Sequence, residues 1–147
     1  MYVPHFDAIL HAIGTNRNEV NGKSRIEIPT ALFKHLLQIA LVHGDFNVAG
    51  YLAENQDVQE AVKKGQVSDP KIHYVGFGFF EGRRGATPQV DEAWYRQTYT
   101  DVANAIRKGE IVSASDHFNM IGAEEFRAPA AQFVKDAVEW KKVSGRP

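Results

Sequence analysis

The chain has no cysteine among its 147 residues. Disulfide bonds, thiolate catalysis and metal sites built from cysteine are therefore excluded. The chain also lacks an excess of either charge, because 17 lysine and arginine residues face 18 aspartate and glutamate residues. A nucleic-acid partner calls for clustered cationic surface, so we expect none.

Long apolar runs are missing as well. The most apolar stretch, residues 36–42, contains Gln38 and is far too short to span a bilayer. Residues 1–14 lack a basic segment, and His5, Asp7 and His11 interrupt their apolar positions, which is unlike a signal peptide. We therefore expect a cytoplasmic protein that does not insert into a membrane.

The most informative feature that is present is one segment that occurs twice. A shift of 44 positions, the separation of Asp57 from Asp101, aligns the two copies without a gap. The residues of the first copy that meet an identical residue in the second are Ala49, Tyr51, Asp57, Val58, Ala61, Lys64, Gly65, His73, Gly78, Glu81 and Arg83. A duplicated segment is a duplicated structural unit, so a residue present in both copies is first a candidate for holding that unit together.

Each copy is expected to contain three helices. In the first copy a short aromatic helix is expected over residues 48–53, a second helix from Asp57 and a third from Asp69. The same elements are expected 44 residues later, where Ser113 replaces Asp69 as the N-cap. Asp57 heads a capping-box pattern, and we expect both Asp57 and its counterpart Asp101 to be N-caps.

The segment before the repeats also favours helices. Apolar residues follow helical spacing in residues 4–13, and residues 31–43 form a strongly apolar helix whose circumference we expect to be mostly buried. Between them, an Asn-Gly pair at 21–22 suits a type I′ turn and residues 25–28 alternate as a strand would. We therefore expect one short hairpin within residues 18–28.

These elements predict a single all-α domain over residues 1–147, in which two tandem helical repeats are flanked by helices at both ends. We define an N-terminal helical region of residues 1–45, a first repeat of 46–83, a second repeat of 90–127 and a C-terminal helix within 128–145, entered at Pro129. The linker between the repeats has only about six residues, so the repeats are expected to pack together.

The first copy reads YLAENQDVQEAV-x2-G…HY-x3-G-x2-EGR. This pattern resembles a short bacterial repeat of the form YLxxNPDVxxAVxxG…HYxxxGxxEGR, and the resemblance covers both repeats. Gln56 stands where that pattern has proline, and Phe126 stands where it has glycine. Repeats of this type occur beside or within glycosyltransferases of cell-surface polysaccharide biosynthesis and in some large secreted proteins. The resemblance implies a module of that setting and no catalytic residue set.

His73 and its counterpart His117 are the residues that most resemble a catalytic base or a ligand-binding group. The alternative is that each imidazole ties one helix of its repeat to another by a hydrogen bond. Catalysis rarely requires the same base twice in tandem, which favours the structural role. The chain has no His-x3-His or HExxH spacing, and its one G-x-G-x3-G pattern follows no strand, so we expect neither a metal nor a cofactor.

Arg83 and Arg127 each follow a glutamate by two positions. As binding groups they suit an anion, because a guanidinium presents paired donors to a carboxylate or a phosphate. Arg83 and the adjacent Arg84 make the place where an anion would best bind. As structural groups, each would pair with the aspartate of its own repeat, Asp57 or Asp101, which explains why these residues recur together. The structural interpretation is favoured.

Aromatic residues are more numerous than one small core needs. Phe77, Phe79 and Phe80 lie on one short helix and cannot all face the same way, and Phe126 adds a ring in the second repeat. Surplus aromatic surface indicates an interface with a protein partner or a second copy of the chain. A platform for stacking sugar rings is the alternative, and the interface is favoured.

The leading hypothesis is a non-catalytic accessory or interaction module of bacterial surface-polysaccharide assembly. We expect it to form a homodimer or to bind a protein partner such as a glycosyltransferase, and a glycan is a further candidate partner. The alternative is a small ligand- or anion-binding protein, or an enzyme, that uses the repeated histidines and arginines in a groove between the repeats. The absence of a catalytic constellation from the sequence favours the first.

Overall fold

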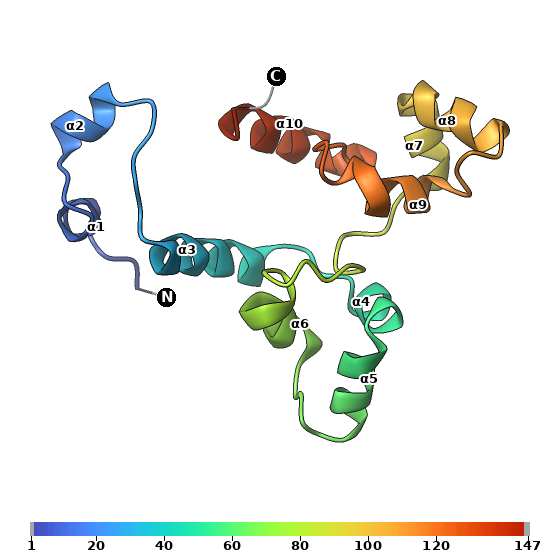
Figure 1. Cartoon of the computed structure of the whole chain (residues 1–147), viewed down its shortest axis with the longest axis horizontal. Coiled ribbons are helices and arrows are strands. Elements are labelled where there is room, and N and C mark those ends of the chain that lie inside the picture. The colour runs from blue at the N-terminus through green and yellow to red at the C-terminus, as the bar shows by residue number, and fades with distance from the viewer. Residues whose placement is uncertain (1, 146–147) are drawn as a thin grey trace. The chain divides into compact units, whose positions relative to one another are not determined.

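The computed structural model describes residues 2–145 and confirms the all-α fold (Figure 1). No strand occurs in the part of the chain that is described. The chain divides into two compact units, one ending at Gly44 and one beginning at Asp45. This boundary falls where the sequence separates the N-terminal region from the first repeat.

The N-terminal unit contains α1 (Phe6–Ala12), α2 (Arg17–Gly22) and α3 (Thr30–His43). The hairpin expected within residues 18–28 is wrong, because residues 17–22 are helical. The side chain of Asn16 accepts hydrogen bonds from the amides of Asn18 and Glu19, which caps α2 and starts a helix where the sequence suggests a turn. Residues 23–29 form no regular element.

The apolar helix α3 differs from expectation in its burial. None of its residues is buried, and Phe33, Leu36 and Val42 are 50%, 44% and 49% exposed. The expectation that most of its circumference is covered is therefore wrong for the single chain. A helix in which apolar residues dominate does not by itself bring other elements onto every face.

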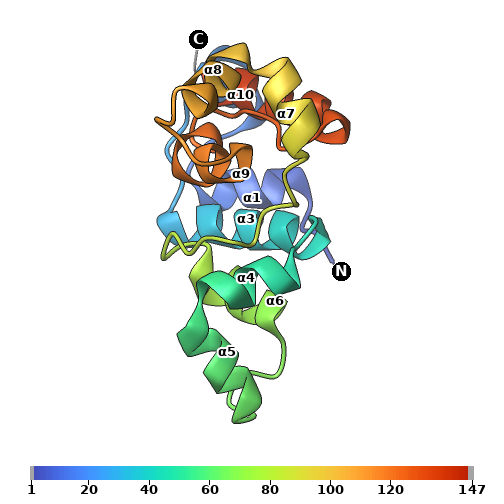
Figure 2. The ribbon, with the colours of Figure 1, turned by 90° about the vertical axis from the view of Figure 1, so that its right-hand side faces the viewer.

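The second unit begins with the two repeats. The first consists of α4 (Val48–Glu54), α5 (Gln56–Lys63), α6 (Pro70–His73) and the π-helix η1 (Tyr74–Gly78). The second consists of α7 (Glu92–Thr98), α8 (Thr100–Arg107), α9 (Ala114–His117) and the π-helix η2 (Phe118–Gly122). Every element of the second repeat begins and ends 44 residues after its counterpart, and in both views α4 contacts α5 and α6 as α7 contacts α8 and α9 (Figures 1 and 2).

Each repeat has a small core of its own. Tyr51 and Val58 are the most buried side chains of the first, and Tyr95 and Val102 occupy the same positions in the second, all at most 2% exposed. Burying a valine or larger apolar side chain contributes about 1.5–3 kcal/mol to folding. Residues identical in the two copies therefore include those that hold each unit together.

The third helix of each repeat changes from α to π geometry halfway, which the sequence did not predict. The amide of Phe79 donates to the carbonyl of Tyr74, and the amide of Ala123 donates to that of Phe118. Both bonds span five residues, the spacing of a π-helix, which occurs in short pieces and often at functional positions.

Asp57 and Asp101 are not N-caps, so that prediction is wrong. The N-cap positions belong to Asn55 and Tyr99, neither of which caps through its side chain, and each aspartate lies in the first turn. A negative charge there still suits the helix N-terminus. By contrast, the caps expected for the third helices are confirmed: Asp69 accepts from the amide of Lys71, and Ser113 accepts from that of Asp116.

The C-terminal helix starts later than expected. A 3-10 turn, η3 (Ala131–Phe133), leads into α10 (Val134–Val143), so the helix does not open at Pro129. Residues 128–130 are buried, and the Pro129 carbonyl accepts a hydrogen bond from the Asp91 amide at 3.0 Å. The segment is therefore used to close the second repeat, and only the chain beyond it is available to form a helix.

The repeats were expected to pack on each other, but the extensive contacts between elements in residues 2–145 lie within one repeat or join η3 to α10. Each repeat closes on itself, the first through a hydrogen bond from the Asn47 amide to the Ala86 carbonyl. Both repeats nevertheless lie in the compact unit that begins at Asp45, and residues of both line one hollow, so the repeats adjoin without extensive contact between their helices. Within the described residues, no helix has the length and apolar character needed to cross a membrane.

Candidate functional site

Each repeat joins its first and third helices through a tyrosine and a histidine. The Tyr51 hydroxyl is hydrogen-bonded to Nδ1 of His73 at 3.0 Å, and the Tyr95 hydroxyl to Nδ1 of His117 at 3.0 Å. The glycine five residues after each histidine makes this possible, because a Cβ on it would clash with the tyrosine hydroxyl. The histidines therefore hold the helices of their own repeats together.

The repeated arginines are engaged in the same way. Arg83 donates from Nη1 to Asp57 at 2.9 Å and from Nε to Glu81 at 2.7 Å. Arg127 makes the same two contacts, with Asp101 at 2.7 Å from Nη2 and with Glu125 at 2.6 Å from Nε. Each guanidinium thus links the start of the second helix to the end of its repeat.

Hydrogen bonds and burial shift the pKa values of these groups. The hydrogen bond from Arg127 holds the pKa of Asp101 below its usual range, and that from Arg83 does the same for Asp57. Burial raises the pKa of Tyr95 and lowers that of His117. At neutral pH the pair of Tyr95 and His117 is therefore uncharged, whereas Arg127 and Asp101 are both charged.

The structure does not bring the histidines and arginines of the two repeats together in one groove. The hollow that includes residues of both repeats has a volume of about 160 Å³, and none of His73, His117, Arg83 and Arg127 lines it. Arg84 is exposed, and its backbone carbonyl accepts a hydrogen bond from the side-chain amide of Asn55. No cluster of three or more possible metal ligands occurs in the described residues.

The aromatic side chains expected at an interface differ in exposure. Phe77 is 63% exposed and Phe79 is 37% exposed, whereas Phe80 and Phe126 are half-buried. The residue equivalent to Phe77 in the second repeat is Ile121, which is 46% exposed. Both repeats therefore present a large apolar side chain at the same position of their π-helices.

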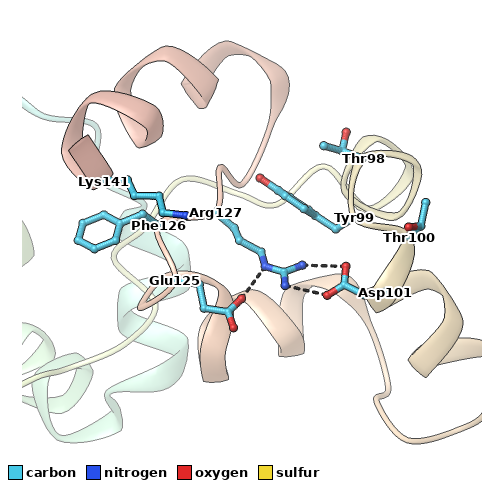
Figure 3. Close-up of a pocket in the computed structure, with 8 residues that line it drawn as sticks. All are labelled: Thr98, Tyr99, Thr100, Asp101, Glu125, Phe126, Arg127 and Lys141. Atoms are coloured by element: carbon cyan, nitrogen blue, oxygen red, sulfur yellow. Dashed lines mark hydrogen bonds and ion pairs between the residues drawn. The ribbon is translucent and has the colours of Figure 1, made fainter. Parts of the chain in front are cut away.

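A hollow of the second repeat lies against the Arg127 cluster and has a volume of about 620 Å³ (Figure 3). Its lining comes from residues 98–101, residues 125–127 and Lys141 of α10. The Arg127 guanidinium lies 4.9 Å from the centre of the Tyr99 ring, and the Tyr99 hydroxyl accepts a hydrogen bond from the Ala128 amide. We call this hollow the Arg127 pocket.

Sequence reasoning missed several residues of these clusters. The identity of Tyr51 and Tyr95 in the two copies was a signal that pointed to a shared role, and their pairing with histidine explains it. Tyr99 carried a weaker signal, because it replaces Asn55 of the first repeat. Lys141 lies outside the repeats, and no pattern in the sequence connects it to Arg127.

Comparisons of the chain with protein-family models, with curated proteins and with solved structures find no match. The family suggested by the repeat pattern therefore stays a prediction.

Proposed function

We propose that the chain is a non-catalytic interaction module that binds a protein partner or a second copy of itself. The observation that carries this proposal is the apolar side chain at the same position of both π-helices, Phe77 and Ile121, each exposed in its repeat. Neither side chain belongs to the buried core of its repeat. A large apolar residue retained at an exposed position in both copies is better explained by an external contact than by folding.

The histidines and arginines support the same proposal. They are the only residues of the repeat pattern that suggested catalysis, and each has a structural partner within its own repeat. A general base must reach the proton that it abstracts, whereas Nδ1 of each histidine is held by the tyrosine hydroxyl of its own repeat. Catalysis therefore has little support from these residues.

The cellular setting that we propose is bacterial surface-polysaccharide assembly, in the cytoplasm. This part rests on the resemblance of both repeats to modules that occur beside or within glycosyltransferases. A glycosyltransferase or another protein of such an assembly is accordingly the partner that we expect.

The proposal is tested by the mass of the protein in solution and by capture of partners from the source organism. The wild-type chain should form a dimer at about 100 µM or retain a polysaccharide-assembly protein. The double variant Phe77→Ser with Ile121→Ser should lose that association. Ile72→Ser is the matched control, because Ile72 is 66% exposed and its counterpart in the second repeat is Asp116.

Two outcomes would contradict the proposal. One is a monomer that captures no partner, and the other is association that survives the double variant. Circular dichroism of each variant checks that the helices remain, which is expected because both substituted side chains are exposed.

A further inference from the structure

The two repeats have the same Arg–carboxylate cluster but differ around it. Arg127, Asp101 and Glu125 match Arg83, Asp57 and Glu81 in type and in contacts. Four other residues that line the Arg127 pocket, 98–100 and Phe126, all differ from their counterparts 54–56 and Gly82. The scaffold is thus retained in the second repeat, while its surroundings are changed.

Phe126 is the most informative of these changes. Its backbone has a φ of 57°, and its counterpart Gly82 has a φ of 71°. The left-handed conformation suits glycine and is unfavourable for a residue with a Cβ, so phenylalanine weakens this turn. The first repeat shows that the turn needs no ring, and a strained residue that lines a pocket is a reason to look for a function there.

The polar groups of the pocket combine donors and acceptors. A guanidinium has five N–H groups, and Arg127 uses three of them on Asp101 and Glu125. The side chains of Asp101 and Glu125 are 62% and 43% exposed, so oxygens of both remain accessible. Lys141, which makes no ion pair among the described residues, adds an ammonium to the lining.

These charges favour an uncharged polar ligand. Asp101 and Glu125 repel an anion, while Arg127 and Lys141 repel a cation, and the two pairs balance. A purely apolar ligand would leave the polar groups of the lining without hydrogen bonds. A ring that carries several hydroxyl groups can both donate and accept, and its C–H face can lie against an aromatic side chain.

We propose that the Arg127 pocket binds a saccharide, whose ring lies against Phe126 and whose hydroxyl groups donate to Asp101 and Glu125 and accept from Arg127 and Lys141. Figure 3 shows the Phe126 ring beside Lys141, whereas Tyr99 lies over the Arg127 guanidinium. A volume of about 620 Å³ lies within the range of small-ligand pockets and has room for one or two sugar rings. This inference goes beyond the interaction function and does not depend on it.

The test uses NMR of the full chain, labelled with ¹⁵N, during titration with cellobiose, mannobiose, galactobiose and N,N′-diacetylchitobiose. At least one disaccharide should shift the amide signals of residues 98–101 and 125–127 in a saturable way at concentrations up to about 20 mM. Absence of such shifts with all four disaccharides would overturn the proposal. Saturable shifts at these residues with inorganic phosphate or acetate alone would also overturn it and would show an anion site.

Phe126→Gly separates binding from folding. The substitution restores the residue that the first repeat has at this position, so the chain should stay folded, whereas the affinity for the disaccharide should fall about tenfold or more. Lys141→Ala should weaken binding by a smaller factor, and Lys142→Ala, one position further along α10 and outside the pocket lining, should leave it unchanged. Unchanged affinity in the Phe126→Gly variant would overturn the proposed role of the ring.

Discussion

The Tyr95 hydroxyl lies 3.0 Å from Nδ1 of His117, and these two residues are 22 positions apart in the sequence. The contact joins α7 to the end of α9 across the inside of the second repeat. Gly122 allows it, because a Cβ at this position would occupy the space of the Tyr95 hydroxyl. The same three residue types occur in the first repeat as Tyr51, His73 and Gly78.

Gly122→Ala should therefore destabilise the chain by about 1–3 kcal/mol, since the added methyl group forces the Tyr95 hydroxyl or the backbone to move. Urea-induced unfolding measures the loss. Gly76→Ala is the control, because nothing lies within 4 Å of a Cβ there and that glycine does not have a positive φ. Equal stability of the two variants would show that the space between Gly122 and the Tyr95 hydroxyl can accommodate a methyl group.

The Phe126→Gly variant should be more stable than the Phe126→Ala variant. This is the reverse of the order that glycine and alanine have within a helix. Both variants lose the phenyl ring, but only Phe126→Ala keeps a Cβ at a φ of 57°. The free energy of unfolding of Phe126→Gly should exceed that of Phe126→Ala by about 1 kcal/mol. A more stable alanine variant would show that the turn rearranges instead of retaining its positive φ.

Acid should weaken the contact of Asp101 with Arg127. The folded chain holds the pKa of Asp101 below its ordinary value of 3.8, so the contact stabilises the fold above that pH and is lost as the pH falls through the lowered pKa. Asp101→Asn should lose less stability than the wild type between about pH 5 and pH 2. Because the Asp101 side chain is 62% exposed, the difference at neutral pH should be about 1 kcal/mol or less.

The control for this experiment is Asp45→Asn. Asp45 is exposed, lies outside the helices and forms no ion pair among the described residues, so the acid dependence of this variant should match that of the wild type. Thermal unfolding followed by circular dichroism at each pH gives the comparison. If the stability of the Asp101→Asn variant falls with pH as steeply as that of the wild type, the contact contributes nothing to the acid dependence.

A second pH dependence should come from His117. Burial lowers its pKa in the folded state below the ordinary value of 6.5, so unfolding takes up a proton between the two pKa values. Stability should be full above about pH 6.5 and should fall as the pH drops through the folded-state pKa. NMR titration of the His117 ring, in the folded chain and in urea, measures both pKa values. A folded-state pKa at or above that in urea would contradict the prediction.

The sequence alone determined the periodic part of this protein. The 44-residue shift located both repeats, and helix-ending glycines and N-caps such as Asp69 and Ser113 placed most of their helices. These features are local, because a cap or a left-handed glycine acts on the backbone within a few residues of itself. The recurrence of aspartate, glutamate and arginine also predicted that each arginine pairs with the aspartate of its own repeat, although not the position of Asp57 and Asp101 within their helices.

Only the tertiary structure decided the contacts between distant residues. It showed that α3 lacks a buried residue, that residues 128–130 close the second repeat, and that Lys141 lines the Arg127 pocket. The partners in these contacts are far apart in sequence, and which of them meet depends on how the helices pack. The apolar content of α3 specified that it would be a helix, whereas its burial depended on whether other parts of the chain were available to cover it.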